Sequence, residues 1–148
     1  MGDMQAIADR IEIEALRAEL TDAVMMRHFD RAVSLFTPEG AMRWPHIDKQ
    51  FVGREEIRAG IEWGQSLWEF FVQNAHPGVI RLDGDTAAGR AHIQEFGRMR
   101  DGSSHLNYAV YHDRYERTSD GWKFSERIYE VRYLDPTPLR GSAPQRLG

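Results

Sequence analysis

The sequence contains no cysteine. Disulfide bonds, thiol nucleophiles and cysteine-ligated metal sites are therefore excluded. No apolar run approaches the roughly 20 residues that a membrane-spanning helix needs, so no membrane partner is expected. The first residues are acidic and lack the hydrophobic stretch of a signal peptide, which makes the cytoplasm the expected location.

An excess of positive charge is also missing. The chain has 19 Lys and Arg against 23 Asp and Glu, a formal net charge of −4. Because binding to a phosphate backbone requires a basic patch, nucleic acid is not an expected partner. His46 and Asp48 form a His-x-Asp motif, but no third ligand follows at a recognisable spacing. The sequence therefore predicts no metal site.

The length and the pattern of the chain predict a single domain over residues 1–148. No internal repeat or linker divides the chain. The folded core is expected at about residues 5–135. The tail at 136–148 is rich in Pro, Gly and Arg, a composition that is typical of irregular structure.

Three helices are predicted in the first half. Apolar residues at helical spacing indicate a long helix over 3–27. Asp30 is the expected N-cap of a short helix over 31–36. A third helix begins with acidic residues at 54–56, where they favour the helix dipole, and carries an aromatic-rich face as far as Phe71.

The remaining segments are predicted to be strands and turns. Thr37 to Gly40 has the composition of a β-turn, and short strands at 41–44 and 50–52 should flank Pro45. Asp83-Gly84 is a strong two-residue hairpin signal. The four predicted long strands span residues 72–82, 86–98, 106–117 and 122–134. Helices grouped beside a mostly antiparallel sheet make an α+β domain, and a strongly twisted sheet can enclose a pocket with them.

Six short segments carry a family resemblance in their order and spacing. They lie at residues 29–40, 53–57, 75–77, 83–87, 115–117 and 121–124. Through them the chain resembles the SnoaL-like branch of the nuclear transport factor 2-like superfamily, over about residues 5–135. The resemblance implies a cone of three helices packed on a curved, mixed, six-stranded sheet, with a pocket in its mouth and no cofactor.

The same resemblance nominates site residues. In members that eliminate water or chloride, a histidine near the start of the third strand removes a proton, and His76 matches that position. A pocket arginine on the last strand is matched by Arg132. Trp44 matches a position held by aromatic pocket residues, and His105 lies near the place of a second acid/base histidine.

One departure from the family pattern concerns the partner of the histidine. In the eliminating members an aspartate near the end of the first helix orients it, whereas here Met26 or Arg27 falls at that place. Asp22 lies one turn earlier, on the same helix face as Met26. Either Asp22 partners His76 from there, or the pair is absent.

The residues themselves leave alternatives open. A histidine with a pKa near about 6.5 can act as a base at neutral pH, but His76 could also be an ordinary strand histidine. Arg132 could bind a ligand oxygen or pair with Glu130 on a solvated face. Tyr108 belongs to the more apolar face of its strand, so we expect it to line the pocket, although a period of two does not decide which face is inward.

Two functions follow. The first is a cofactor-independent lyase or isomerase (a dehydratase, isomerase or polyketide cyclase-like enzyme) that uses His76 to take a proton from a small, ring-containing, apolar substrate. The second is a non-catalytic module that binds a small ligand or assembles with other subunits, resembling the β subunit of a ring-hydroxylating dioxygenase. A homodimer or homotrimer is compatible with both.

Overall fold

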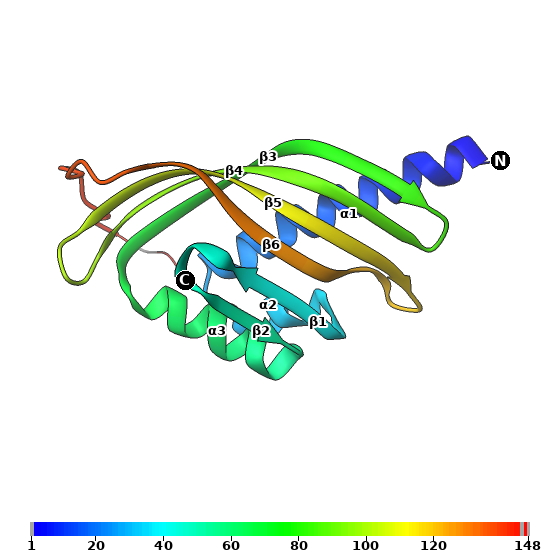
Figure 1. The fold of residues 1–148 in the computed structure, drawn as a ribbon, viewed down its shortest axis with the longest axis horizontal. Coiled ribbons are helices and arrows are strands. Elements are labelled where there is room, and N and C mark those ends of the chain that lie inside the picture. Colours follow the sequence, from blue (N-terminus) through cyan, green and yellow to red (C-terminus); the bar gives the residue numbers. More distant parts are fainter. Residues whose placement is uncertain (1, 146, 148) are drawn as a thin grey trace.

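The computed structural model describes residues 2–145 and 147 as three α-helices and a curled six-stranded sheet (Figure 1). The helices are α1 (Gly2–Met25), α2 (Phe29–Ser34) and α3 (Arg54–Ser66), with a short 3-10 helix η1 (Pro45–Ile47). The strands are β1 (Phe36–Trp44), β2 (Lys49–Val52), β3 (Trp68–Asp83), β4 (Thr86–Met99), β5 (Ser104–Thr118) and β6 (Gly121–Asp135). Within the described residues, no helix is both long enough and apolar enough to span a membrane.

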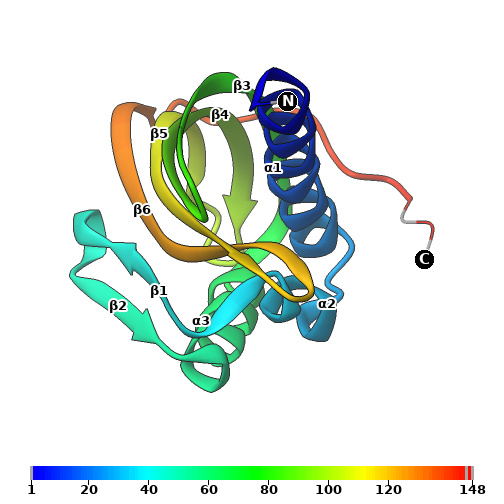
Figure 2. The same ribbon diagram turned by 90° about the vertical axis from the view of Figure 1, so that its right-hand side faces the viewer.

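The strand order in the sheet is β2-β1-β6-β5-β4-β3. The contact between β1 and β6 is parallel, and every other pair of neighbours is antiparallel. Figure 2 shows the long strands β3 to β6 curling strongly, with α1 alongside β3 and with α2 and α3 close to β1. The predicted α+β cone with a mixed sheet is therefore confirmed.

The main hydrophobic core fills one end of the cone, where α1 and α2 close on the sheet. From α1 it takes Ile13, Leu16, Leu20 and Ala23, and from the strands Phe36, Ile80, Tyr115 and Phe124. These side chains are at most 7% exposed. Burying apolar surface of this extent is the main source of folding free energy, so this end holds the fold together.

The predicted stripe on the first helix is only partly buried. Ile7 and Ile11 are 58% and 65% exposed, because Asp9 takes the inward position there and receives two hydrogen bonds from Arg117. The helix ends at Met25 rather than at residue 27, where Arg27 has a positive φ of 57°.

Three predicted boundaries are wrong. Residues 37–40 belong to β1, where a shift of register against β6 takes the place of the expected turn. Asp30 lies inside α2, whose N-cap is His28. The third helix ends at Ser66 because Trp68 to Phe71 pair with β4, and this non-local strand pairing overrides the helical spacing of the aromatic residues.

Two local predictions are confirmed. The hairpin between β3 and β4 is present, but its two turn residues are Gly84 and Asp85, because Asp83 still pairs with Thr86. Gly84 has the positive φ of 64° that the first turn residue requires. Residues 41–44 and 49–52 pair as antiparallel strands around η1.

Candidate active site

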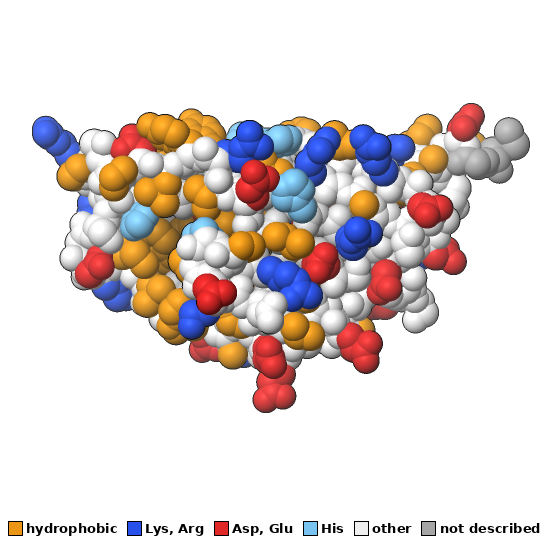
Figure 3. All heavy atoms as spheres, in the orientation of Figure 1, with side chains coloured by type: hydrophobic (Ala, Val, Ile, Leu, Met, Phe, Trp, Pro, Cys, Tyr) orange, Lys and Arg blue, Asp and Glu red, His pale blue; other side chains and the backbone are white. Residues whose placement is uncertain are grey.

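A cavity of about 550 Å³ is lined by the concave face of the sheet together with α1, η1 and α3. Its walls are mostly apolar and include Leu20, Met42, Trp44, Leu67, Trp68, Phe71 and Val131. Three more lining residues, Ile47, Trp63 and Leu134, are 44%, 42% and 44% exposed. Figure 3 shows hydrophobic side chains gathered over the half of the molecule that contains α3 and the end of β6, whereas charged side chains dominate the other half. The exposed lining residues mark the mouth of the cavity.

Small residues on α3 allow two aromatic side chains to pack against it. A Cβ built on Gly60 would lie 2.7 Å from the Phe51 ring, and one on Gly64 would lie 3.1 Å from the Trp44 ring. The rings of Trp44 and Phe51 meet edge to face at 5.0 Å. The glycine spacing of the helix therefore sets the position of Trp44 in the cavity wall.

The inner wall of the cavity carries a row of polar residues on three neighbouring strands. Gln73 of β3 lies opposite Glu95 of β4, which lies opposite Asn107 of β5. Gln73 Nε2 donates to Glu95 Oε2 at 3.0 Å, and Asn107 Nδ2 donates to Glu95 Oε1 at 3.3 Å. The Tyr129 hydroxyl also donates to Glu95 Oε1. Strand register thus places a carboxylate that is only 6% exposed among three neutral donors.

The position of Gln73 is set from the first helix. Thr21 Oγ1 of α1 donates to Gln73 Oε1 at 3.0 Å, which turns the amide nitrogen of Gln73 toward Glu95. A hydrogen bond between the end of the first helix and the third strand is therefore present. It joins a hydroxyl to an amide, whereas the family pattern predicts a carboxylate and a histidine.

Beside this row lies a buried ion-pair cluster. Arg127, which also lines the cavity, donates through Nε and Nη2 to Asp113 at 2.8 and 3.1 Å. The Tyr115 hydroxyl donates to Asp113 at 2.7 Å, and Arg17 Nε donates to the same hydroxyl at 2.7 Å. The guanidinium of Arg127 stacks on the Tyr111 ring, 3.8 Å from its centroid. This contact presents a cation behind one aromatic wall of the cavity.

The cavity tyrosines are neutral donors at physiological pH. Burial raises the pKa of Tyr129 above its usual range, and the nearby Glu95 carboxylate adds to this effect. Burial likewise raises the pKa of Tyr111. Because a neutral phenol has a proton to give, Tyr129 can donate a hydrogen bond at all ordinary pH values.

Two histidines line the cavity, His46 from η1 and His105 from β5. The His46 ring packs against the Tyr129 ring at 5.1 Å, and burial lowers the pKa of His46. The His105 ring meets Trp68 edge to face at 5.5 Å. Across residues 2–145 and 147, no group of three or more His, Cys, Asp or Glu side chains comes together as a metal site.

The structure does not bring the predicted pair of Asp22 and His76 together. The Asp22 side chain is 61% exposed and accepts a hydrogen bond from Arg31. His76 is exposed and lies three residues from the inward-facing Gln73, so the alternation of the strand places it on the opposite face. Neither residue lines the cavity.

Of the other four predicted residues, two line the cavity and two do not. Trp44 and His105 line the cavity. Arg132 is exposed and lies 3.6 Å from Glu130, which is the surface pairing that the sequence left open. Tyr108 is 46% exposed, because the more polar face of its strand, with Asn107 and not Tyr108, is the inward one. The expectation that the more apolar face turns inward is therefore corrected.

Sequence reasoning missed Glu95, although a signal for it exists. In β4, Ala91, Ile93 and Gly97 are buried on the same face, and Glu95 falls between them at the period of two. A carboxylate in an apolar alternation must find donors inside the fold, since burying a charge without partners costs far more than burying a neutral polar group. Such an interruption of a strand pattern is itself a pointer to a site.

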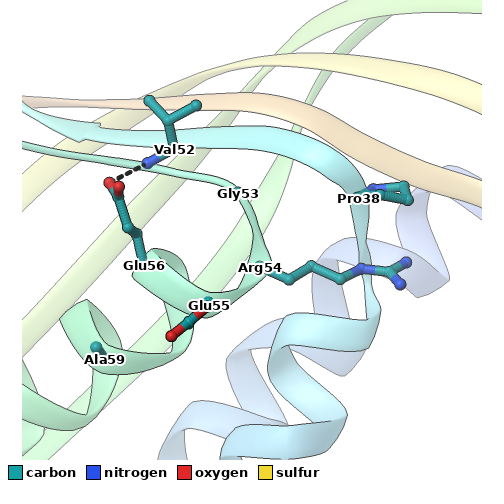
Figure 4. A pocket seen from close by; sticks show the side chains of 7 residues that line it. All are labelled: Pro38, Val52, Gly53, Arg54, Glu55, Glu56 and Ala59. Atoms are coloured by element: carbon teal, nitrogen blue, oxygen red, sulfur yellow. Dashed lines mark hydrogen bonds between the residues drawn. The ribbon is translucent and has the colours of Figure 1, made fainter.

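A second hollow lies between β1 and the start of α3 (Figure 4). It is lined by Pro38, Val52, Gly53, Arg54, Glu55, Glu56 and Ala59. Arg54 donates hydrogen bonds from Nε and Nη2 to the Phe36 carbonyl oxygen, at 2.9 and 2.6 Å. Glu56 Oε1 accepts a hydrogen bond from the Val52 backbone amide at 2.9 Å. These side chains stabilise the local backbone, so the mostly apolar cavity between the sheet and the helices is the better candidate for an active site.

The chain is similar to several known proteins. It is 29% identical over 148 residues to the gamma-hexachlorocyclohexane dehydrochlorinase of Sphingobium indicum, covering 95% of this chain and 90% of the relative. A solved hexachlorocyclohexane dehydrochlorinase superposes with a TM-score of 0.87 at 21% identity, over 96% of this chain and 98% of the other. A candidate scytalone dehydratase of Novosphingobium aromaticivorans superposes with a TM-score of 0.80 at 18% identity, over 97% of both chains. These two structures share the fold.

The family match covers most of the chain and agrees with the architecture. The SnoaL-like domain matches residues 5–128, which run from the first turns of α1 into β6. The same segment contains the helices and strands that line the cavity, apart from the end of β6. The chain belongs to the SnoaL-like domain family.

Proposed function

We propose that this protein is a cofactor-independent lyase or isomerase that acts on a small, largely apolar, ring-containing molecule in the cavity. The observation that carries the proposal is the buried Glu95 carboxylate on the inner wall of an otherwise mostly apolar cavity. A carboxylate held away from water is a suitable general base, because little solvent competes for the proton or for the charge. The dehydrochlorinase relative, by its name, catalyses an elimination, which is the same type of reaction.

In this mechanism Glu95 removes a proton from a ring carbon. The electron pair of the broken C–H bond then forms a carbon–carbon double bond as the bond between the neighbouring carbon and the leaving group breaks. In a dehydration the departing hydroxyl oxygen takes up the proton that Glu95 removed and leaves as water, which restores the carboxylate. In an isomerisation the pair moves into a neighbouring carbonyl, and the proton returns at another carbon. Dehydration is our preferred reaction.

Groups around Glu95 can assist this step. Arg127 lines the same cavity, so its positive charge can favour an oxygen that becomes negative. Tyr129 gives its one hydroxyl proton to Glu95 and so helps to position the base. His46, whose pKa is lowered by burial, is neutral near pH 7 and can accept or return a proton. We assign the general base to Glu95 rather than to His76, because His76 is exposed and does not line the cavity.

A non-catalytic ligand-binding protein is the second candidate. The observation in its favour is that three donors already satisfy much of Glu95, which is also what a purely structural carboxylate requires. In that case the cavity would hold a ring compound without changing it.

The test is turnover by the wild-type protein and by Glu95→Gln. Gamma-hexachlorocyclohexane and cyclic hydroxy-ketones would be incubated with each protein, and chloride release or the absorbance of the new double bond would be measured. Loss of a general base should lower kcat by about 10²–10⁴-fold. Glu116→Gln, which changes an exposed carboxylate of β5, is the control.

The outcomes separate the two candidates. Turnover that Glu95→Gln abolishes and Glu116→Gln retains supports the enzyme and its base. Turnover that Glu95→Gln leaves intact shows that another residue is the base. Tight binding of a ring compound without any turnover favours the binding protein.

A further inference from the structure

In the side-chain amide of Asn107, the oxygen Oδ1 has no hydrogen-bond partner among the described residues. Its side chain lines the cavity and the residue is only 9% exposed. Nδ2 donates to Glu95 Oε1 at 3.3 Å, whereas Oδ1 is buried and meets no hydrogen-bond donor among the described residues. Buried carbonyl oxygens are rarely left without a donor, because the lost hydrogen bond is not replaced.

The orientation of this amide follows from the chemistry of its neighbour. An ionised carboxylate only accepts hydrogen bonds, so the nitrogen of Asn107 must face Glu95. The same logic holds on the other side, where Gln73 turns Nε2 toward Glu95 while its Oε1 accepts from Thr21. Turning the Asn107 amide over would point its oxygen at a negative charge. Oδ1 is therefore kept as an acceptor on the side away from Glu95.

Among the described residues of β6, those directly beside Asn107 offer no donor to Oδ1. The Tyr129 hydroxyl, which also lies near Asn107, gives its one proton to Glu95. Asn107 lies opposite Leu134 of β6, and both line the cavity. Val131, the other apolar residue of β6 in the lining, is equally unable to donate. A donor for Oδ1 has to come from what occupies the cavity.

We infer that the ligand of the cavity is a hydroxylated ring compound, a phenol or a cyclic alcohol, whose O–H donates to Asn107 Oδ1 while its ring lies against Trp44, Trp68 and Phe71. The inference rests on the proposed function, in that it takes this cavity as the substrate site. It favours loss of water or isomerisation of a hydroxylated ring over loss of chloride, since a chlorinated cyclohexane has no donor for this oxygen. Asn107 then determines specificity, while Glu95 is the base.

The experiment is calorimetric titration of the full chain with three ligands of one ring system. They are 2-naphthol, which has a donor, 2-methoxynaphthalene, which keeps the oxygen but lacks the donor, and naphthalene. For the wild type we expect 2-naphthol to bind about tenfold or more tightly than the other two, because an unmet buried acceptor disfavours the ligands that cannot donate.

The variant Asn107→Leu, of similar size, should remove this preference. It should bind 2-methoxynaphthalene more tightly than the wild type does, because that ligand no longer leaves a buried acceptor unmet. Asn74→Leu, on the exposed part of β3, should retain the preference. If Asn107→Leu does not fold, Asn107→Ser, which shortens the side chain and withdraws the acceptor, should lower the preference in the same direction.

Each remaining outcome decides the matter. A wild type that binds all three ligands equally overturns the inference and leaves the proposed function standing. A preference for 2-naphthol that persists in Asn107→Leu also overturns it, because the acceptor is then another group such as Glu95. Failure of all three ligands to bind overturns the cavity as a ring-binding site, and with it both the proposed function and the inference.

Discussion

Two buried carboxylates on neighbouring strands of the same sheet have hydrogen-bond partners of opposite kinds, charged for one and neutral for the other. Asp113 of β5 is held by the guanidinium of Arg127, with Tyr115 and Arg17 behind it. Glu95 of β4 receives hydrogen bonds only from neutral groups. Asp113 is absent from the cavity lining, whereas Glu95 is part of it.

The difference in partners indicates that the two carboxylates have different roles. A buried carboxylate that is paired with a cation has its charge balanced and becomes part of the framework, and removing it leaves the cation unpaired. A carboxylate held by neutral donors is solvated without being neutralised, so its charge stays available to a ligand. The comparison therefore predicts that Asp113 supports stability and that Glu95 supports function.

The largest effect should come from breaking the framework carboxylate. Asp113→Asn leaves Arg127, 2% exposed, and Arg17, 4% exposed, buried without their anion. We expect a loss of about 3–5 kcal/mol in the free energy of unfolding, measured by urea denaturation. Asp120→Asn, at a 90% exposed side chain, should change it by less than about 0.5 kcal/mol. A loss below about 1 kcal/mol for Asp113→Asn would remove the basis of the comparison.

The next effect is on a largely buried ion pair near the other end of α1. Arg117 donates to both oxygens of Asp9, at 2.6 and 2.9 Å, and joins the helix to β5. Asp9→Asn should cost about 2 kcal/mol at pH 7, the range for hydrogen bonds between charged groups. The matched control is Asp85→Asn, which pairs with the same arginine but is 83% exposed and should cost far less.

This pair also predicts a dependence on pH. The hydrogen bonds from Arg117 hold the pKa of Asp9 well below its usual range. Between the two values the unfolded chain binds more protons than the folded chain, so the stabilisation is complete above about pH 4 and is lost as the pH falls further. Unfolding curves of wild type and Asp9→Asn should converge toward pH 2. Curves that stay parallel down to this pH would contradict the assignment.

A smaller change is expected at the functional carboxylate. In Glu95→Gln, the amide of Gln73 can turn over, and the Thr21 hydroxyl can then accept instead of donate, so every group keeps a partner. The free energy of unfolding should fall by about 1 kcal/mol or less, even though turnover is lost. Urea denaturation with Glu116→Gln as control tests this. A loss comparable to that of Asp113→Asn would make Glu95 a framework residue as well.

The smallest effect concerns His46 at the cavity. Burial lowers the pKa of His46, so the unfolded chain takes up this proton first as the pH falls below about 6.5. Its contribution is thus present above about pH 6.5 and decreases as the pH falls toward the folded pKa. His46→Gln should weaken the fall in stability between pH 7.5 and 5.5, while His28→Gln, at an exposed position, should not. An NMR titration midpoint of His46 at or above about 6.5 would rule this out.

Much of the fold was predictable because its signals are local. The hairpin signal at Asp83-Gly84, the alternation of the four long strands and the apolar spacing of Leu16 and Leu20 each depend on residues close in sequence. The boundaries failed where distant pairing decides. Trp68 and Phe71 have helical spacing, yet they pair with β4, and a register shift against β6 replaces the expected turn at Pro38.

The site was less predictable for the same reason. Trp44 and His105 line the cavity, whereas Asp22 and His76 lie apart on exposed faces. The choice of Tyr108 relied on the more apolar strand face turning inward. A cavity that holds polar groups reverses that rule, since Asn107 faces inward and Tyr108 outward.

By itself, the sequence determined the α+β class, the SnoaL-like fold and most of the element order, because propensity, periodicity and turn chemistry act over short distances. Only the tertiary structure decided which residues meet in the cavity. Gln73, Glu95 and Asn107 are far apart in the chain and become neighbours through strand register, and a shift of one residue would turn each side chain to the other face. Register and sheet curvature are properties of the whole packed sheet, and they turn Glu95 toward the cavity and His76 toward the exposed face.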